Sequence, residues 1–371
     1  MRTIRTTAVA ALSVAALLSG AAAPAKADIT LGLGDGVTGQ IAALGDQAKR
    51  GTEQAVKDIN AAGGVLGQQI KLQIGDDACD PKQAVSVANQ FVSSGVKLVI
   101  GHLCSGASIA ASDVYAEENI MMISGSATAP ALTERGKKNV FRVCGRDDQQ
   151  GELAGKLIAD KFKGKKIAII NDKQAYGQGL AAAAEKTLKA AGVTPAIVTA
   201  INAGDRDFGA LVARLKEADI GVVYYGGYNQ ELGLMVRQAR ERGLQSQFIG
   251  ADGIASTDYW AITGDAGAGT LFTFSPDAKS NPAAAKVVEE LRAGGRDPDN
   301  FALYFYSATQ VMAEAIKKAG SPDPAKVESA LHSGEFDTIV GKVKFDAKGD
   351  LTRPDYVFYE WRDGKYAVAK M

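Results

Sequence analysis

A turn rich in small and hydroxyl-bearing residues, 101–108, carries the clearest chemical pattern in the chain. It follows an apolar run at residues 97–100, which predicts a buried parallel strand, and it precedes residues 107–118, which predict a helix. The first N–H groups of a helix have no internal partners, and the helix dipole adds partial positive charge there. His102 is the only cationic candidate in the turn. We therefore expect the turn to bind a carboxylate rather than a polyphosphate.

A second hydroxyl-rich loop, residues 124–130, follows the next predicted strand. Ser126 and Thr128 could complete a carboxylate site begun by Ser105, because the carboxyl ends of parallel strands meet at one edge of a sheet. An ordinary polar loop is the alternative interpretation.

Aromatic and acidic residues follow strands in the second half of the chain, where Tyr176, Tyr228 and Asp252 stand just after apolar runs. Aromatic rings give apolar walls with a polar edge, and a buried carboxylate can pair with an ammonium group. Each residue alone is more often a surface residue than a ligand contact. Together with Ser105 they predict a site complementary to a zwitterion.

Patterns for catalysis and for cofactors are weak. Ser105 lies in no G-x-S-x-G motif, and neither His102 nor His332 has an evident nucleophile partner. Residues 34–39 match G-x-G-x-x-G, but the next helix is predicted to start later and the acid that ends the second strand is too distant. Residues 76–77 are interpreted as loop caps. With no Cys or His spacing typical of a metal site, we expect no enzyme, no metal and no cofactor.

The first 27 residues predict a secretory signal peptide. Arg2 and Arg5 precede an apolar stretch at 8–18, and residues 25–27 fit a small-x-small cleavage pattern. The apolar stretch is too short to span a membrane. The balanced charge of 42 basic and 42 acidic residues gives no indication of binding to nucleic acid or to an anionic membrane.

Export places the three cysteines in an oxidising compartment. Cys79 and Cys104 follow successive predicted strands, where they could form a disulfide; two buried thiols are the alternative. Cys144 is then expected to be a partly buried free thiol.

Strands and helices alternate along the chain, which predicts an α/β protein with two doubly wound parallel-sheet units and a ligand cleft between them. The first unit has predicted strands at 29–33, 70–74, 98–100 and 120–123, with helices at 47–62, 80–93 and 107–118. The second has strands at 166–170, 194–201, 220–225 and 247–249, with helices at 151–162, 179–191, 208–218 and 230–242. Further helices are expected at 283–293, 301–318 and 324–332, and a hairpin-like tail at 339–345 and 356–368 with turns at 348–350 and 363–365.

Three segments, 75–84, 99–105 and 224–228, resemble the periplasmic leucine/isoleucine/valine-binding proteins, the solute receptors of branched-chain amino acid ABC transporters. The resemblance extends from residue 28 to about residue 361. It implies a type I periplasmic binding fold with three hinge crossovers. It places lobe one at 28–146 plus 276–356 and lobe two at 147–275 plus 357–371.

The resemblance also assigns roles to individual residues. Contacts to the ligand carboxylate are Ser105 and Thr128, with backbone groups of Leu103, Cys104 and Ser126; contacts to the ammonium are Asp252, carbonyl groups near Ser126 and the ring edge of Tyr228; the pocket wall is Leu44, Tyr176, Gly227 and Phe301; the disulfide is Cys79–Cys104.

Three positions depart from the family pattern. Leu44 stands where the relatives have tyrosine, Asp252 where they have glutamate, and Ser126 where they have alanine. A smaller, more polar pocket with a retracted carboxylate leaves alanine, proline or γ-aminobutyrate open as ligands.

The leading hypothesis is a monomeric periplasmic receptor that binds aliphatic, branched-chain amino acids and delivers them to an inner-membrane ABC permease. One alternative keeps this role with γ-aminobutyrate, proline or alanine as the main ligand. A second is a sensor that signals to a chemoreceptor or kinase without transport. A third, an exported hydrolase on the same scaffold, would require Ser105 to support turnover.

Overall fold

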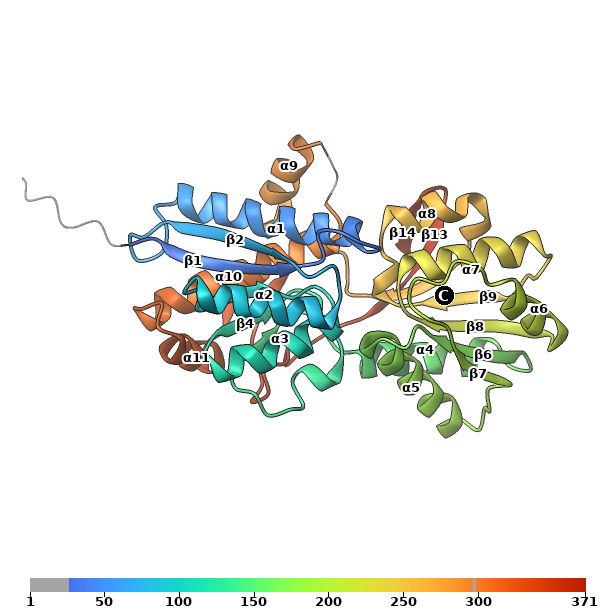
Figure 1. The fold of residues 1–371 in the computed structure, drawn as a ribbon. Coiled ribbons are helices and arrows are strands. Elements are labelled where there is room, and N and C mark those ends of the chain that lie inside the picture. Colours follow the sequence, from blue (N-terminus) through green and yellow to red (C-terminus); the bar gives the residue numbers. More distant parts are fainter. Residues whose placement is uncertain (1–26, 296–297) are drawn as a thin grey trace, which may run out of the picture.

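The computed structural model describes residues 27–295 and 298–371. The predicted signal peptide, residues 1–27, lies outside the described residues except for its last residue. Within the described ranges, no helix has both the length and the apolar character needed to cross a membrane. The predicted α/β fold is confirmed, and the elements gather around two sheets that form two bodies side by side (Figure 1).

The first sheet contains β1 (Ile29–Asp35), β2 (Ile70–Asp76), β3 (Leu98–Gly101), β4 (Met121–Ser124) and β5 (Val140–Arg142). All five strands are parallel, in the order β2-β1-β3-β4-β5. Every residue of β3 and β4 is buried, which explains their unbroken apolar runs. The carboxyl ends of β3 and β4 therefore place the two hydroxyl-rich loops next to each other.

The second sheet contains β6 (Lys166–Asn171), β7 (Ile197–Ala200), β8 (Ile220–Gly226), β9 (Gln247–Gly250), β10 (Leu271–Phe274), β13 (Val357–Arg362) and β14 (Lys365–Val368). Its order is β14-β13-β10-β9-β8-β6-β7, and β13 runs antiparallel to both β10 and β14. The antiparallel strands at this edge belong to the tail that was predicted to be hairpin-like. Strand β10 was not predicted, because its four residues include a buried Thr273 that interrupts the apolar run.

The helices are α1 (Ala42–Ala61), α2 (Pro81–Ser93), α3 (Ser105–Glu117), α4 (Asp147–Lys161), α5 (Ala175–Ala190), α6 (Gly209–Glu217), α7 (Asn229–Glu241), α8 (Thr257–Thr263), α9 (Ala285–Ala293), α10 (Asn300–Ala319) and α11 (Pro324–Ser333). The predicted cap of α2 is confirmed, since the Asp80 carboxylate accepts hydrogen bonds from the N–H groups of Lys82 and Gln83. Helices α1, α3 and α5 begin earlier than predicted, because their N-cap residues provide no side-chain cap that the sequence could reveal.

Two hairpins form the tail. β13 and β14 meet at a turn whose residues Asp363 and Gly364 have φ angles of 50° and 77°, as a tight hairpin turn requires. The predicted turn at 363–365 is thus confirmed. A separate hairpin joins β11 (Phe336–Thr338), which was not predicted, to β12 (Gly341–Val343) inside the predicted 339–345 segment.

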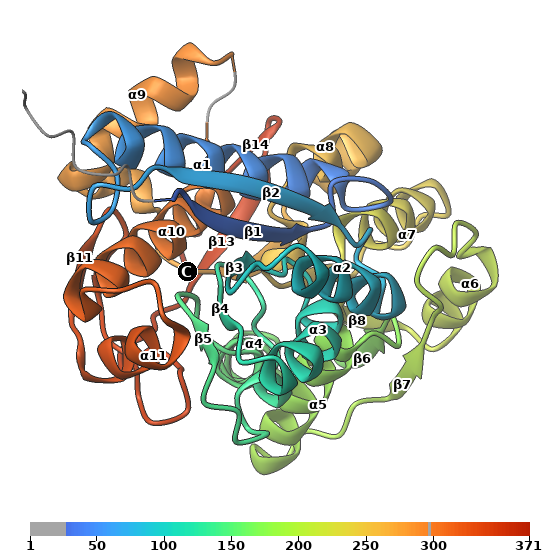
Figure 2. The same ribbon diagram turned by 60° about the vertical axis from the view of Figure 1, so that its left-hand side comes forward.

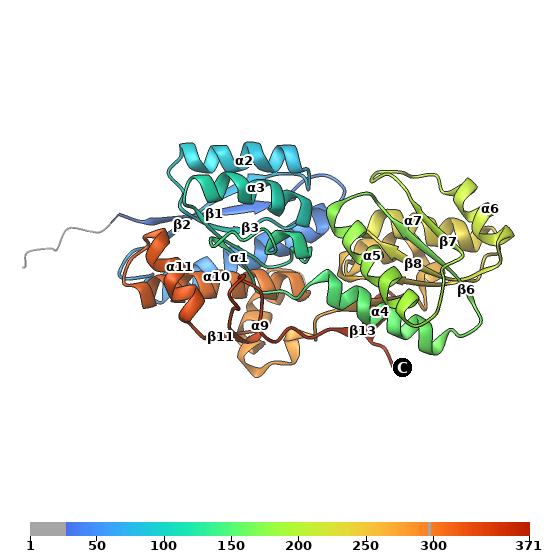
Figure 3. The ribbon, with the colours of Figure 1, turned by 90° about the horizontal axis from the view of Figure 1, so that it is seen from below.

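The chain passes between the two bodies three times. It leaves the first sheet after β5, returns after β10 and crosses again before β13. Between the last two passages, α10 packs against α1, β3 and β4, and α11 packs against α10. Figure 2 shows α10 and α11, in orange and red, with the blue elements of the first sheet, and Figure 3 shows the dark red β13 segment running on to the second body.

A buried network of charged side chains joins the first crossing between the two bodies to the segment that precedes the third crossing. The Arg142 guanidinium donates to Asp350 at 2.6 Å, and Arg146 donates to the other oxygen of Asp350 at 2.7 Å. Both Arg142 and Asp350 are buried, and two basic partners hold the pKa of the Asp350 carboxyl below its usual value despite this burial. Charged side chains therefore hold the ends of these two crossings together, in addition to the backbone.

Candidate functional site

The hydroxyl turn forms the first turn of α3. Ser105 is the first residue of this helix, and its N-cap, Cys104, has extended backbone and makes no capping hydrogen bond through its side chain. The Ser105 hydroxyl accepts a hydrogen bond from the Ala129 N–H at 3.1 Å. The helix start thus presents N–H groups and one hydroxyl, which is the chemistry of an anion site.

Hydrogen bonds hold the second hydroxyl loop against this turn. The Ser126 hydroxyl donates to the Leu103 carbonyl at 2.7 Å, and the Ser124 hydroxyl donates to the His102 carbonyl at 2.8 Å. The Arg142 guanidinium also donates to the carbonyls of Ala127 and Ala129, at 2.8 and 3.0 Å. The backbone on both sides of Thr128 is therefore fixed.

Both ring nitrogens of His102 have partners within the first body. Its side chain is fully buried, with Nδ1 at 2.5 Å from Asp77 Oδ2 and Nε2 at 2.8 Å from the Tyr115 hydroxyl. The predicted role of Asp77 as a loop cap is confirmed, because its other oxygen accepts the Cys79 N–H at 2.7 Å. The anion site therefore relies on N–H and hydroxyl groups.

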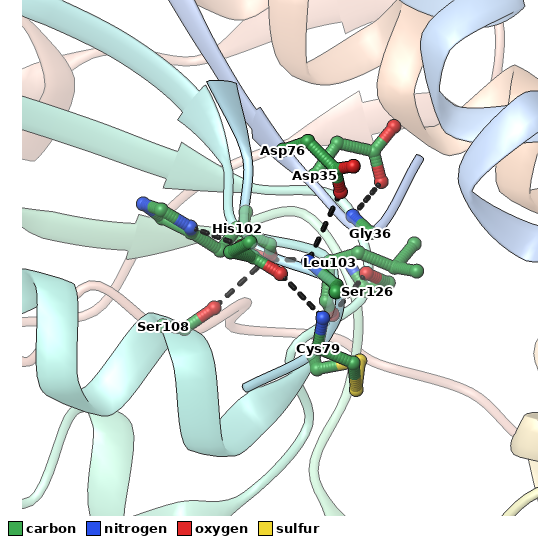
Figure 4. The surroundings of a disulfide bond; sticks show 12 residues. Asp35, Gly36, Asp76, Cys79, His102, Leu103, Ser108 and Ser126 are labelled. Carbon is green, nitrogen blue, oxygen red and sulfur yellow. Dashed lines mark hydrogen bonds and ion pairs between the residues drawn. A yellow bond between two sulfur atoms is a disulfide. The ribbon is translucent and has the colours of Figure 1, made fainter. Parts of the chain in front are cut away.

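A disulfide joins Cys79 to Cys104, with Cα atoms 5.5 Å apart, as the family resemblance implied. It links the loop after β2 to the residue that precedes α3, beside Leu103 and Ser126 (Figure 4). Cys144 is a free thiol, but it is buried rather than partly buried. Burial raises the pKa of the Cys144 thiol, so the sulfur stays protonated and unreactive.

The second body contributes an acid and two rings. The Tyr176 hydroxyl donates to Asp252 Oδ1 at 2.5 Å and accepts the Gly253 N–H at 2.8 Å. The rings of Tyr176 and Tyr228 lie 5.0 Å apart. Burial raises the pKa of Asp252 to about 6, although hydrogen bonds from Tyr176 and Gln150 oppose the shift. Asp252 is therefore a buried acid that favours a cationic partner.

These groups surround a cavity between the two bodies with about 290 Å³ of empty space. Its walls come from both bodies: Leu44, Leu103, Ser105, Ser126, Tyr176, Tyr228, Asp252, Gly253 and Phe301. Sequence analysis named all of these residues except Gly253.

Three predicted contact residues do not line the cavity. Thr128 is buried behind the lining at 1% exposure, and Cys104 is occupied by the disulfide. Gly227 lies in the turn after β8 and is not among the lining residues; a Cβ atom there would lie 2.3 Å from the Tyr225 hydroxyl. Their predicted roles toward a ligand stay predictions.

Sequence reasoning missed Gly253 and Asp147. A Cβ atom at position 253 would lie 2.9 Å from the Gly227 carbonyl and from the Tyr176 ring, so only glycine fits there. Asp147 is a fully buried carboxylate at the start of α4. Because this helix was predicted to begin at residue 151, nothing in the sequence indicated that Asp147 lies at a helix start.

The remaining sequence motifs do not form cofactor or metal sites in the described residues. The glycine-rich loop at 34–39 precedes α1, whose first residue is Ala42, so the third glycine does not open a helix as in a dinucleotide site. Among residues 27–295 and 298–371, no group of three or more His, Cys, Asp or Glu side chains could hold a metal ion.

Two α/β bodies joined by three crossings, with a cavity that residues of both bodies line, define a bilobal solute-binding protein. Residues 28–365 match the family model described as periplasmic binding protein. The chain belongs to this family.

Named relatives cover nearly the whole chain. The Leu/Ile/Val-binding protein homolog 1 of Brucella suis is 49% identical over 346 residues, which are 92% of this chain and 93% of that protein. The leucine-, isoleucine-, valine-, threonine- and alanine-binding protein of Pseudomonas aeruginosa is 46% identical over 334 residues, 90% of each chain.

Solved structures agree with the fold. A leucine-binding protein from Thermotoga maritima superposes with a TM-score of 0.86 at 26% identity and covers 92% of this chain and 98% of its own. A branched-chain amino acid substrate-binding protein from Streptococcus pneumoniae, in complex with isoleucine, gives a TM-score of 0.83 at 26% identity and covers 93% of this chain and 100% of its own.

Proposed function

We propose that this protein is a periplasmic receptor that binds aliphatic amino acids, above all leucine, isoleucine and valine, and delivers them to an inner-membrane ABC permease. One observation carries the proposal: the same cavity is lined by Ser105, at the start of α3, and by the buried acid Asp252. These are the complements of a carboxylate and an ammonium group. The names of the Brucella and Pseudomonas relatives support the ligand class.

In this proposal Ser105 and the N–H groups that follow it bind the ligand carboxylate, with Thr128 and the backbone of Leu103 and Cys104 around them. Asp252, the Ser126 carbonyl and the edge of Tyr228 receive the ammonium. Tyr176 acts through Asp252, because its hydroxyl fixes the orientation of that carboxylate.

Apolar wall residues would receive the aliphatic side chain. Leu44 and Phe301 are buried, and the Phe301 ring lies 4.9 Å from that of Phe274, which closes the wall behind it. Burying a leucine-sized side chain here contributes about 2 kcal/mol or more to binding.

The two lobes, 28–146 plus 276–356 and 147–275 plus 357–371, would close on the ligand by a hinge motion. A ligand that contacts both lobes at once binds the closed form more tightly, and it shifts the population by that difference in affinity. The three crossings between the sheets are the segments that would bend.

Calorimetry tests the proposal on protein freed of bound ligand by unfolding and refolding. Leucine, isoleucine and valine should bind with micromolar or tighter affinity, about −8 kcal/mol. Ser105→Ala should weaken binding, and Ser86→Ala, on the exposed face of α2, is the matched control. The absence of heat with every α-amino acid would contradict the proposal.

A second candidate keeps the receptor role but takes γ-aminobutyrate, proline or alanine as its main ligand. It is favoured by the short side chain of Asp252, which is held back by Tyr176, and by the additional hydroxyl of Ser126 beside the cavity. Competition between leucine and γ-aminobutyrate distinguishes the two candidates.

A further inference from the structure

The proposed function assigns no role to His102, although its surroundings are unusual for a histidine. The ring is fully buried, with Nδ1 at 2.5 Å from Asp77 Oδ2 and Nε2 at 2.8 Å from the Tyr115 hydroxyl. Both partners are fully buried as well. A polar ring costs stability in such an interior unless both of its nitrogens are paired, and an apolar side chain would fill the same space without that requirement. The histidine therefore calls for a reason beyond packing.

The imidazole ring links three elements of the first body. Asp77 follows β2, His102 follows β3, and Tyr115 belongs to α3. Asp77 extends the chain of hydrogen bonds, because its other oxygen accepts the Cys79 N–H at 2.7 Å and its own N–H donates to the Asp35 carbonyl at 2.8 Å. An ionised carboxylate accepts from Nδ1–H, and a phenol can both donate and accept, so the two ring contacts persist in either protonation state of the imidazole.

Two glycines make room for the ring. A Cβ atom at position 34, in β1, would lie 2.5–2.6 Å from three atoms of the His102 ring. A Cβ atom at position 101 would lie 2.1 Å from the Gly34 carbonyl oxygen, and Gly101 has a φ of 110°, which favours glycine. The ring therefore lies against the bare backbone of β1. With a hydrogen-bond partner at each nitrogen, its orientation is fixed.

The main chain of His102 is held as firmly as its ring. Its carbonyl accepts the hydroxyl of Ser124 at 2.8 Å and that of Ser108 at 3.0 Å (Figure 4). The cavity lining begins with the next residue, Leu103, and continues with Ser105, whereas His102 is not part of it. His102 thus holds the residue directly before the cavity wall without reaching the cavity itself.

Resting on the proposed function, we propose that His102 is a positioning residue of the carboxylate site. Through Asp77 and Tyr115 its ring fixes the direction in which the first N–H groups of α3 point. A hydrogen bond weakens steeply when its donor turns away from the acceptor, so a small rotation of this turn costs carboxylate affinity. The ammonium contacts proposed on the second body do not depend on the ring.

Calorimetry with leucine and with leucinamide tests this on His102→Leu, which removes both hydrogen bonds of the ring. Leucinamide keeps the ammonium and the side chain of leucine but has a neutral amide in place of the carboxylate. His102→Leu should weaken leucine about 30-fold, as expected for two lost hydrogen bonds, and leucinamide by less than about threefold. His102→Asn, whose amide can still donate to Asp77, should bind leucine within about fivefold of wild type.

Tyr115→Phe tests the other end of the chain, and it decides if His102→Leu does not fold. It removes one hydroxyl and should weaken leucine about fivefold, whereas wild-type affinity would overturn the proposal. Tyr306→Phe is the matched control. The Tyr306 hydroxyl also donates to a carboxylate, that of Asp58 at 2.9 Å, but the residue lies outside the cavity lining. It should leave leucine affinity unchanged.

The outcomes separate the two proposals. If the wild type binds leucine and a folded His102→Leu binds it equally well, or loses leucine and leucinamide to the same extent, the positioning role is overturned and the receptor function stands. If leucinamide binds the wild type too weakly to measure, the comparison of His102→Asn with His102→Leu decides, and equal losses overturn the proposal. If the wild type binds no amino acid, the receptor function fails and the positioning role falls with it.

Discussion

At the scale of single residues, Asp252 links the chemistry of the site to pH. Its pKa of about 6 means that it is charged at pH 7 and largely protonated at pH 5. A protonated acid no longer attracts an ammonium group. Leucine affinity measured by calorimetry should therefore be nearly constant above pH 7 and fall about tenfold between pH 7 and pH 5.

The same position provides the control. Asp252→Asn should remove this pH dependence and weaken leucine binding at pH 7 by about 2–5 kcal/mol, since the buried ammonium loses its charged partner. Asp258→Asn, on the adjacent helix α8, should keep the wild-type profile. An affinity for wild-type protein that does not change between pH 5 and pH 8 would contradict the ammonium role of Asp252.

Residue types near strand ends could be predicted because they carry chemistry in their side chains. Ser105, Tyr176 and Asp252 stand after apolar runs and all reach one cavity. Gly253 acts through the side chain that it lacks, and the burial of Asp147 arises only when α4 packs beside the hinge. Neither the role of the missing side chain at position 253 nor the burial of Asp147 can be predicted from a single sequence.

At the scale of elements, the disulfide joins two loops that otherwise depend on hydrogen bonds. The bond closes a loop with a sequence separation of 25 residues. Such a loop restricts the unfolded chain enough to stabilise the fold by about 3.5 kcal/mol. Replacing both Cys79 and Cys104 by serine should lower the free energy of unfolding in urea by this amount.

The leucine affinity of that double variant should fall less than tenfold. The bonds from Ser126 and Arg142 still hold the two loops in place. Cys144→Ala is the control that keeps the disulfide. A double variant with wild-type stability would show that the crosslink adds nothing to the fold.

The pattern of elements was predictable where apolar periodicity was strong. The start of helix α2 was predictable from its N-cap, Asp80, and from Pro81 in its first turn. Helices α3 and α5 begin without capping side chains, and β10 is short and contains a buried threonine. Tertiary packing fixes these boundaries. Local sequence rules therefore find the site residues near the helix starts, but they place the first residue of each helix a few positions too late.

At the scale of the whole molecule, buried acids set the dependence of stability on pH. Burial raises the pKa of Asp35 and Asp147 well above the usual value, and that of Asp172 to about 7. Between pH 4 and these values the folded protein binds more protons than the unfolded chain. The free energy of unfolding of ligand-free protein should therefore fall as pH rises from 5 to 7.5, by up to about 1.4 kcal/mol per unit for each such group.

At low pH the free energy of unfolding changes in the opposite direction, because acids such as Asp350 have lowered pKa values. Their stabilising contribution is lost as the pH falls through the lowered pKa of the folded state. Stability should be greatest near pH 5. Chemical denaturation at pH 5 and pH 7.5 measures the difference, and Asp172→Asn should reduce it. A protein more stable at pH 7.5 than at pH 5 would contradict this account.

The two-body architecture followed from alternating strands and helices, but the partition of the tail did not. The family resemblance alone assigns residues 357–371 to lobe two, and β13 and β14 pair within the second sheet. Hairpin patterns show that two strands meet each other. They do not show which sheet the pair will join.

The position of β13 in the second sheet also has a consequence for the order of synthesis. This strand leaves the ribosome after all other strands of its sheet except β14, yet Trp361, one of the largest fully buried side chains, belongs to it. A nascent chain that ends at residue 356 lacks this part of its interior. The second body therefore completes its folding only after translation of the C-terminal hairpin, and truncation before β13 leaves a chain that exposes the apolar surface on which chaperones act.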